Sequence, residues 1–238
     1  SLGFSDKRLQ RIDAAIEREI AEGTLPGATM AIARRGKLAY HEAFGHLDPA
    51  AGTPMPKDAI FSIASMSKPM TAVGALMLYE EGRMMVNEPV GKYLPQLSRM
   101  RVGTPGCDGS PAQTVALDRE ATIQDLMRHT SGFSYGRGPT PLHNIYPVGS
   151  AIAAAQWSGA EFLERLAALP LHFQPGSAWE YSLGLDVLGL AIEATVGKPL
   201  REYLNINGYG FGLGVAVRRG AGISGVASSR GEFHRAGS

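Results

Sequence analysis

Ten residues just after the first quarter of the chain carry its clearest chemical signal: Phe61-Ser62-Ile63-Ala64-Ser65-Met66-Ser67-Lys68-Pro69-Met70. Ser65 and Lys68 stand three positions apart, so in a helix both side chains lie on one face. A serine hydroxyl becomes an effective nucleophile when a base accepts its proton, and a lysine amine within hydrogen-bond distance is one such base. The S-x-x-K spacing therefore points to nucleophilic catalysis. The alternative is a helix-capping serine beside a solvated lysine.

The residues that follow Lys68 predict a helix. Apolar side chains recur at helical spacing and the pattern ends at Gly82; they are Met70, Val73, Leu76 and Met77. Pro69 is compatible with this helix because it falls in the first turn. Ser65 is therefore expected near the helix N-terminus, where free N–H groups and the positive end of the helix dipole stabilise a developing negative charge.

The composition is that of an ordinary globular protein and excludes several classes. The chain has 238 residues, 44% of them hydrophobic and 19% charged, and a net charge of +1. This charge balance argues against nucleic-acid and membrane partners, and no apolar run is long enough to span a bilayer. The single cysteine, Cys107, excludes an internal disulfide and a cysteine-rich metal site. The first twenty residues lack a signal-peptide core, so we expect a cytoplasmic protein unless a leader was removed.

The rest of the chain predicts an α+β arrangement, because a helix is followed by antiparallel strands. Helices are expected at 9–20, 122–128, 159–168 and 185–196, and strands at 28–33, 38–45 and 208–217. Residues 96–118 and 134–148 are expected to be loops. His41 and His46 are expected to decorate strand and turn, since a lone histidine without a spaced partner is weak evidence for a metal site.

Four stretches together resemble the serine β-lactamase and penicillin-binding-protein superfamily. In chain order they are Ser65-Met66-Ser67-Lys68, His129-Thr130-Ser131-Gly132, Phe173-Gln174-Pro175-Gly176 with Tyr181-Ser182-Leu183, and Gly208-Tyr209-Gly210-Phe211-Gly212-Leu213-Gly214. The resemblance implies an antiparallel sheet flanked by helices plus a mainly helical subdomain. Within one catalytic domain, residues 1–60 and 205–238 would belong to the α/β part and residues 61–204 to the helical part.

The resemblance also implies roles for single residues. Ser65 would attack the acyl carbon, Lys68 would accept its proton, and Tyr181 would act as general base or as a proton shuttle to the leaving alcohol. Which of Lys68 and Tyr181 is the true base stays open. Gly237 and Ser238 match the weak third motif, so the backbone N–H groups of Ser65 and Ser238 would form the oxyanion hole.

Leu183 separates the branches of the superfamily. It stands where class C β-lactamases and D-alanyl-D-alanine peptidases usually carry asparagine, and Tyr-Ser-Leu is similar to the β-lactamase-like family VIII carboxylesterases. Leucine cannot offer the amide hydrogen bond of asparagine, so the resemblance implies small carboxylic esters as substrates, with possible weak β-lactam hydrolysis. The alternatives are a class C-like β-lactamase or D-alanyl-D-alanine peptidase, and a catalytically inactive binding module.

Several further expectations follow from the same comparison of motifs. No metal or organic cofactor is needed for this chemistry, and we expect no nucleophile elbow of an α/β-hydrolase. Relatives place a long segment between stretches like Leu204 and Gly208, so the fold is expected to be incomplete relative to the family. Its unpaired sheet edges would favour a homo-oligomer. Aromatic residues expected near the substrate pocket are Phe133, Tyr135, Trp157 and Trp179.

Overall fold

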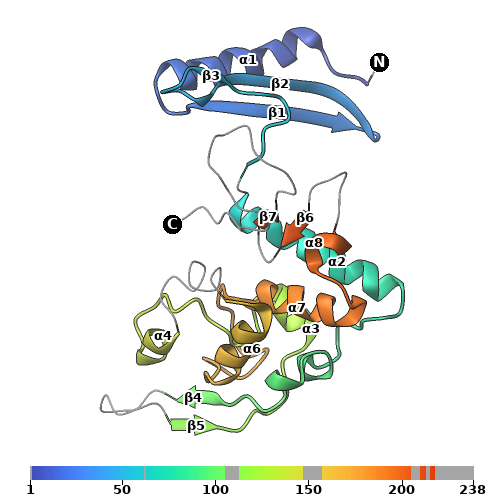
Figure 1. Cartoon of the computed structure of the whole chain (residues 1–238), viewed down its shortest axis with the longest axis vertical. Coiled ribbons are helices and arrows are strands. Elements are labelled where there is room, and N and C mark those ends of the chain that lie inside the picture. Colours follow the sequence, from blue (N-terminus) through green and yellow to red (C-terminus); the bar gives the residue numbers. More distant parts are fainter. Residues whose placement is uncertain are drawn as a thin grey trace. The chain divides into compact units, whose positions relative to one another are not determined.

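The structure, a computed structural model, describes residues 2–61, 63–104, 113–146 and 157–204, together with the backbone of residues 210–212 and 215–217. Cys107, Gly237 and Ser238 lie outside the described residues. The chain forms two compact units that divide after Phe61 (Figure 1). None of the helices in the described ranges is both long enough and apolar enough to cross a bilayer.

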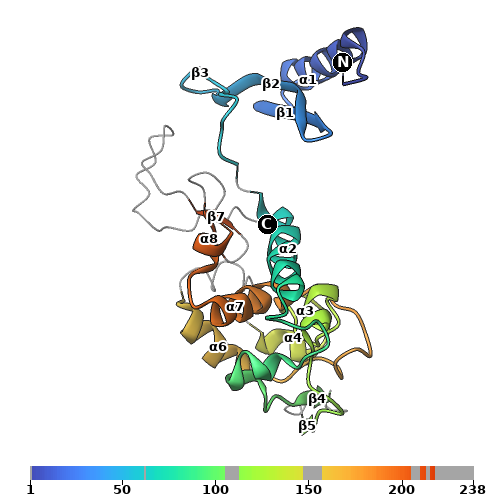
Figure 2. The same cartoon turned by 90° about the vertical axis from the view of Figure 1, so that its right-hand side faces the viewer.

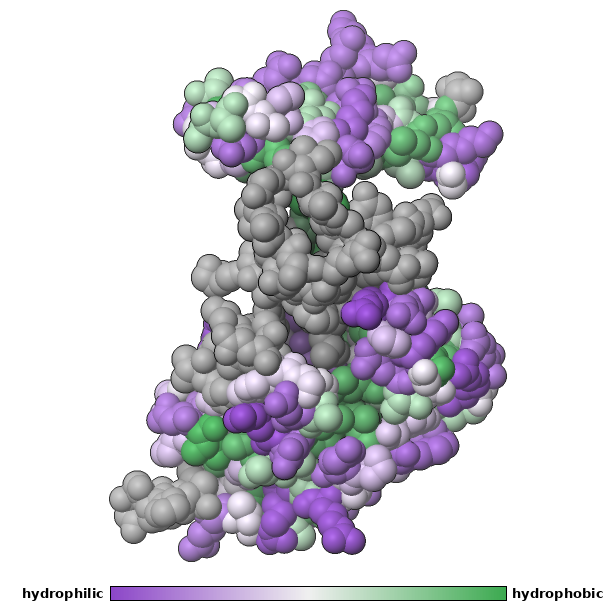
Figure 3. All heavy atoms as spheres, viewed as in Figure 1, coloured by the Kyte–Doolittle hydropathy of each residue, from purple (hydrophilic) through white to green (hydrophobic). Residues whose placement is uncertain are grey.

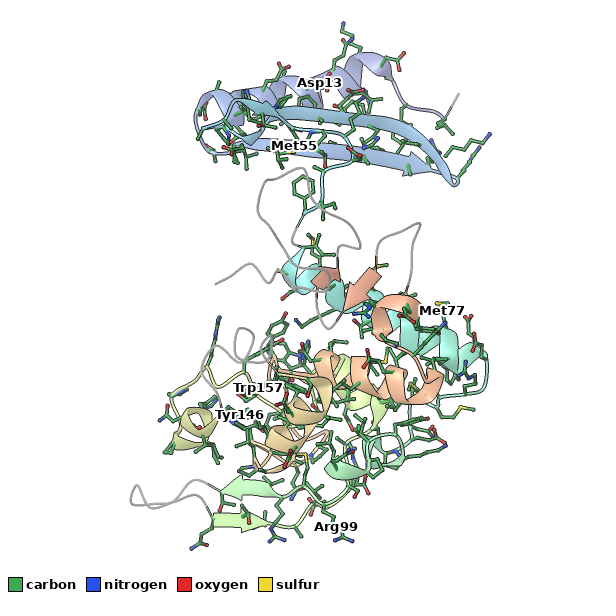
Figure 4. The ribbon with its side chains drawn as sticks, viewed as in Figure 1. Asp13, Met55, Met77, Arg99, Tyr146 and Trp157 are labelled. Atoms are coloured by element: carbon green, nitrogen blue, oxygen red, sulfur yellow. The ribbon has the colours of Figure 1, made fainter. Side chains whose placement is uncertain are left out.

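The first unit is one helix on a three-stranded antiparallel sheet (Figures 1 and 2). Its elements are α1 (Asp6–Ala21), β1 (Gly27–Arg34), β2 (Lys37–Asp48) and β3 (Thr53–Pro54), and the strand order is β1-β2-β3. Arg35 and Gly36 join β1 to β2 and have φ of 54° and 70°, the left-handed pair typical of a two-residue hairpin turn. Tyr40 on β2 donates a hydrogen bond to Asp13 on α1 (Figure 4), which ties the helix to the sheet.

The second unit is mainly helical and is built around α7 (Gly184–Val196). Residues 184–192 of α7 are all buried and, apart from Asp186, all apolar, as expected for a central helix. The helices around it are α2 (Ser67–Glu80), α3 (Ile123–Arg128) and α8 (Leu200–Tyr203), and α6 (Gly159–Ala167) adds Phe162, Leu163 and Leu166 to the same core. Together with the sheet of the first unit, these helices confirm the α+β fold class.

The buried face of α2 consists mostly of small residues. Thr71, Gly74, Ala75 and Leu78 are buried, and a Cβ on Gly74 would lie 2.9 Å from Leu204 Cδ2, so the missing side chain lets α8 approach closely. Most of the apolar residues that predict this helix lie on its other side: Val73 is 50% exposed, Leu76 41% and Met77 44% (Figure 4). Figure 3 shows hydrophobic patches that interrupt the hydrophilic surface of each unit.

Three segments differ from the sequence-based expectation. Residues 96–118 contain a hairpin of β4 (Val102–Thr104) and β5 (Gln113–Val115), and residues 134–148 contain the short helix α4 (Pro141–Ile145). The predicted strand at 208–217 is two short antiparallel strands, β6 (Gly210–Gly212) and β7 (Val215–Val217). Two 3-10 turns, Val90–Lys92 and Pro95–Leu97, follow α2. These elements are three to five residues long, too short for a hydrophobic period to reveal.

Candidate active site

Ser65 lies in a single 3-10 turn, Ala64–Met66, directly before α2. Ala64 has a φ of 43°, in the left-handed region that residues other than glycine seldom adopt. The turn is held by Ser67, whose hydroxyl donates to the Ala64 carbonyl at 2.8 Å. Local backbone strain of this kind costs about 1–3 kcal/mol and persists where the surrounding contacts impose it. The turn leaves Ser65 exposed at the helix end.

The structure brings Ser65, Lys68 and Tyr181 together within the second unit. The Tyr181 hydroxyl lies 2.6 Å from Ser65 Oγ, although 116 positions separate the two residues. Lys68 Nζ lies 3.3 Å from the same oxygen and 5.0 Å from the centre of the Tyr181 ring. One hydroxyl is thus within hydrogen-bond distance of two groups that can carry its proton. The Tyr181 side chain is 40% exposed, so the group is open to a small molecule.

Tyr135 lies beside Lys68 and Tyr181. Its ring lies 5.5 Å from the Tyr181 ring and 5.6 Å from Lys68 Nζ, within the range of a cation–π contact. Its hydroxyl donates to Asp186 near the start of α7 at 3.4 Å. Tyr135, one of the aromatic residues expected near the pocket, thus contacts both Tyr181 and Lys68.

His129 anchors the segment that carries Tyr181. Its Nδ1 accepts the backbone N–H of Ser182 at 3.2 Å, its carbonyl accepts the N–H of Glu180 at 3.0 Å, and its ring lies 4.6 Å from the Tyr181 ring. Burial, and secondly the Lys68 ammonium, hold the pKa of His129 below its ordinary value. The neutral imidazole is therefore favoured, and its Nδ1 lone pair is free to accept. The sequence identifies His129 only as part of a motif and does not predict that it positions the segment carrying Tyr181.

A buried carboxylate holds Thr130, the residue after His129, in place. Asp125 on α3 is fully buried and accepts hydrogen bonds from Arg119 at 2.6 Å, the Thr122 backbone N–H at 2.9 Å and the Thr130 hydroxyl at 2.9 Å. Burial alone would raise the pKa of Asp125, but these hydrogen bonds outweigh it and hold the pKa well below its usual range. Asp125 is thus an ionised anchor for the turn after α3.

The other predicted site residues stand apart from this group. Leu183 is 1% exposed and belongs to the hydrophobic core, so a substrate contact at this residue stays a prediction. Phe133 is also a core residue, and Trp157 packs against the same core. Trp179 is 66% exposed and touches the edge of His129, with ring centres 6.2 Å apart.

The sequence does contain one G-x-S-x-G pentapeptide, Gly132-Phe133-Ser134-Tyr135-Gly136, which is the pattern of a nucleophile elbow. The structure decides against that function. Ser134 is fully buried and its hydroxyl accepts the Gly136 N–H at 3.0 Å. No strand leads into the pentapeptide in the described part of the chain, and no helix begins directly after it. Ser134 therefore lacks the exposed position that an elbow gives its serine.

Comparisons with known proteins show the family to which the chain belongs. A family model described as beta-lactamase matches residues 12–228. Esterase EstB of Burkholderia gladioli is 37% identical over 192 residues, which are 80% of this chain and 46% of EstB. The structure of EstCE1, a hydrolase with promiscuous acyltransferase activity, matches with a TM-score of 0.65 at 28% identity over 83% of this chain and 49% of EstCE1.

A further solved relative is simvastatin synthase LovD from Aspergillus terreus, with a TM-score of 0.65 and 28% identity over 84% of this chain and 50% of LovD. The chain thus spans about half the length of the relatives it matches. The family match, by contrast, covers most of the chain. With the S-x-x-K serine, its lysine and the tyrosine of the second motif gathered at one point, the chain belongs to the beta-lactamase family.

Proposed function

We propose that this chain carries the nucleophile and proton-transfer groups of a carboxylic ester hydrolase that works through an acyl-enzyme. The observation that carries the proposal is the 2.6 Å contact between the Tyr181 hydroxyl and Ser65 Oγ. A buried tyrosine hydroxyl in a purely structural role would be satisfied by a nearby backbone group. Tyr181 is instead partly exposed, and its hydroxyl contacts Ser65, a serine that also contacts the Lys68 amine.

The proposed reaction has two steps. In acylation, Ser65 Oγ attacks the ester carbonyl carbon while Lys68 or Tyr181 takes its proton; the bond to the alcohol oxygen then breaks and the alcohol leaves with a proton. In deacylation, a water molecule loses a proton to the same group and attacks the acyl carbon, which releases the acid and restores the Ser65 hydroxyl. Both Lys68 Nζ and Tyr181 Oη lie within 3.3 Å of Ser65 Oγ, so the geometry supports either as the base.

Three observations favour esters over β-lactams. By resemblance of the second motif, Leu183 stands where class C β-lactamases carry asparagine, and its buried side chain offers a substrate no amide group. EstB is named an esterase and EstCE1 a hydrolase with acyltransferase activity. The exposed setting of Tyr181 and Ser65 leaves room for an alcohol group. We therefore assign the chain to the family VIII carboxylesterase branch as part of this proposal.

The test compares three probes on the purified protein. We expect hydrolysis of p-nitrophenyl butyrate, much slower hydrolysis of a chromogenic cephalosporin, and a covalent adduct on Ser65 after treatment with an alkyl phosphonate, detected by peptide mass spectrometry. The variant Ser65→Ala should lose both the activity and the adduct. Faster cephalosporin hydrolysis would identify a β-lactamase, and failure to form any adduct would identify an inactive binding module.

A further inference from the structure

Two histidines and a glutamate meet in the second unit, apart from Ser65. His143 lies on α4, and His172 and Glu180 lie on the segment between α6 and α7. His143 Nε2 is 3.5 Å from Glu180 Oε1, and His172 Nδ1 is 3.4 Å from Glu180 Oε2. One nitrogen from each imidazole and one carboxylate oxygen all lie within 4.8 Å of one another.

These separations suit metal ligands better than hydrogen bonds. An N–H···O hydrogen bond usually spans about 2.7–3.2 Å, and the two imidazole–carboxylate distances of 3.4 and 3.5 Å are longer. In a tetrahedral Zn²⁺ site, bonds of about 2.0–2.1 Å place neighbouring ligand atoms about 3.3–3.4 Å apart. The two imidazole nitrogens approach different oxygens of Glu180, and one ligand atom from each residue lies within 4.8 Å of the others, so a rotation of the carboxylate would bring one oxygen between the two nitrogens.

Packing around the two imidazoles fixes them in this arrangement. The His172 side chain is only 4% exposed, and its ring packs edge-on against His143 at 4.4 Å and against Tyr146 at 4.9 Å. Its Nε2 is buried and has no hydrogen-bond partner, which is unusual for a buried polar atom. The position of the ring is thus set by packing, with Nδ1 directed to Glu180.

Two contacts with Thr140 hold the His143 ring in place. Its Nδ1 accepts the Thr140 backbone N–H at 3.3 Å and lies 2.5 Å from the Thr140 hydroxyl, so the neutral ring carries its proton on Nε2. A metal ion at Nε2 requires the other tautomer, in which Nδ1 donates to the Thr140 hydroxyl as the second ring nitrogen of an imidazole ligand usually does. Gly138 keeps the space beside the ring free, because a Cβ at that position would lie 2.3 Å from Nε2. Glu180 is 24% exposed and provides a route of entry from solvent.

We propose that His143, His172 and Glu180 bind a divalent transition metal ion of the Zn²⁺ class. Two imidazoles and one carboxylate suit Zn²⁺, Co²⁺ or Ni²⁺, whereas Mg²⁺ and Ca²⁺ prefer sites made of oxygen atoms. Three protein ligands leave a fourth position for water. The site needs no contribution from Ser65 or Lys68, so metal binding can be tested independently of ester hydrolysis.

The first experiment titrates the purified protein with Co²⁺ and follows the visible absorption that tetrahedral Co²⁺ shows. We expect bands that saturate at one ion per chain and disappear when Zn²⁺ is added. The variants Glu180→Gln and His143→Ala should lose them, and His41→Ala, a histidine on β2 in the other unit, should retain them. Absence of the bands in the wild-type protein, or their retention in Glu180→Gln, overturns the proposal.

The second experiment controls for folding. Isothermal titration calorimetry with Zn²⁺ should show binding weakened about 10- to 100-fold or more in Glu180→Gln, since even removal of an outer-shell partner has effects of that size. Zn²⁺ should also raise the melting temperature of the wild-type protein but not that of Glu180→Gln, and Mg²⁺ should raise neither. Gly138→Ala keeps all three ligands and should weaken binding by displacing the His143 ring. Equal Zn²⁺ affinity in wild type and Glu180→Gln, with both proteins folded by circular dichroism, would refute the site.

Discussion

The imidazole of His129 accepts the backbone N–H of Ser182 at 3.2 Å, and this bond fixes the residue that follows Tyr181. The two residues lie on segments 53 positions apart, so the contact joins the turn after α3 to the start of α7. The position of the Tyr181 hydroxyl over Ser65 therefore depends on a side chain that itself contacts neither Ser65 Oγ nor, in our proposal, the substrate.

His129 is a positioning residue whose acceptor can be tested with a pair of variants. His129 has a φ of 58°, which glycine and asparagine both tolerate. His129→Asn keeps an acceptor near the Ser182 N–H, whereas His129→Gly removes it. We expect kcat for p-nitrophenyl butyrate to fall by roughly 10- to 100-fold in the glycine variant, with KM little changed, because misplacement by about 1 Å has effects of that size.

The asparagine variant is the control for this test. It should recover a clear part of the lost kcat, because it restores the acceptor without restoring the ring contact with Tyr181. If both variants lose kcat equally, or if the loss appears in KM, His129 does not act through the Ser182 backbone.

Tyr181→Phe removes one oxygen and keeps the ring that packs against His129 and Tyr135. We expect kcat to fall by roughly 10²- to 10⁴-fold, the usual contribution of a positioned proton-transfer group. The melting temperature should change little, because the hydroxyl is exposed and its hydrogen bond within the described residues goes to the exposed Ser65. The measurement is steady-state hydrolysis together with thermal unfolding. A variant that retains wild-type kcat would remove Tyr181 from the mechanism and leave Lys68 as the base.

The long periodic elements could be predicted from the sequence. α1, the β1–β2 hairpin, α6 and α7 all have clear patterns, and the hairpin turn at Arg35-Gly36 follows from its glycine. Ser65, Lys68 and Tyr181 were identified from family motifs, and no local pattern could show that the Tyr181 ring meets Lys68. The contact depends on how α7 packs between α2 and α3.

The features that could not be predicted from the sequence all depend on tertiary contacts. The buried face of α2 has Gly74 and Ala75 at its centre, because close approach of another helix favours small side chains over the most hydrophobic ones. His143, His172 and Glu180 have no spacing typical of a metal motif, since His143 lies on α4 and the other two lie on the segment between α6 and α7. The Nδ1 acceptor of His129 is likewise visible only when the turn after α3 is placed beside Ser182.

Asp125→Asn should destabilise the second unit in a pH-dependent manner. The folded pKa of Asp125 lies below the unfolded value of about 3.9, so the ionised side chain stabilises the fold above that pH and this contribution is lost as pH falls toward the folded pKa. At pH 7 we expect a loss of about 3 kcal/mol, typical of removing one partner from a buried ion pair. Urea unfolding of both proteins between pH 3 and pH 7 measures the difference, which should shrink at the acid end.

Glu161→Gln is the matched control for that measurement. Asp125 forms a capping box with Thr122 at the start of α3, and Glu161 forms one with Ser158 at the start of α6. Unlike Asp125, Glu161 is exposed to solvent. Its replacement should have a much smaller effect at every pH. A stability difference for Asp125→Asn that stays constant from pH 7 to pH 3 would show that the charge of Asp125 is not what stabilises the turn after α3.

Gly184, the first residue of α7, should not tolerate a side chain. A Cβ there would lie 2.7 Å from the backbone oxygen of Leu126 and 3.3 Å from its Cα, so α3 would have to move away from α7. We expect Gly184→Ala to cost about 1–3 kcal/mol in unfolding free energy, as overpacking of a core does, and to lower kcat because Tyr181 lies only three residues before Gly184. Gly159→Ala is the comparison, since its Cβ would meet only the end of the Leu190 side chain at 2.7 Å and alanine favours the helix. Urea unfolding should rank Gly184→Ala as clearly the less stable of the two; equal stabilities would show that the backbone approach of α3 to α7 can relax, and with it the placement of Tyr181.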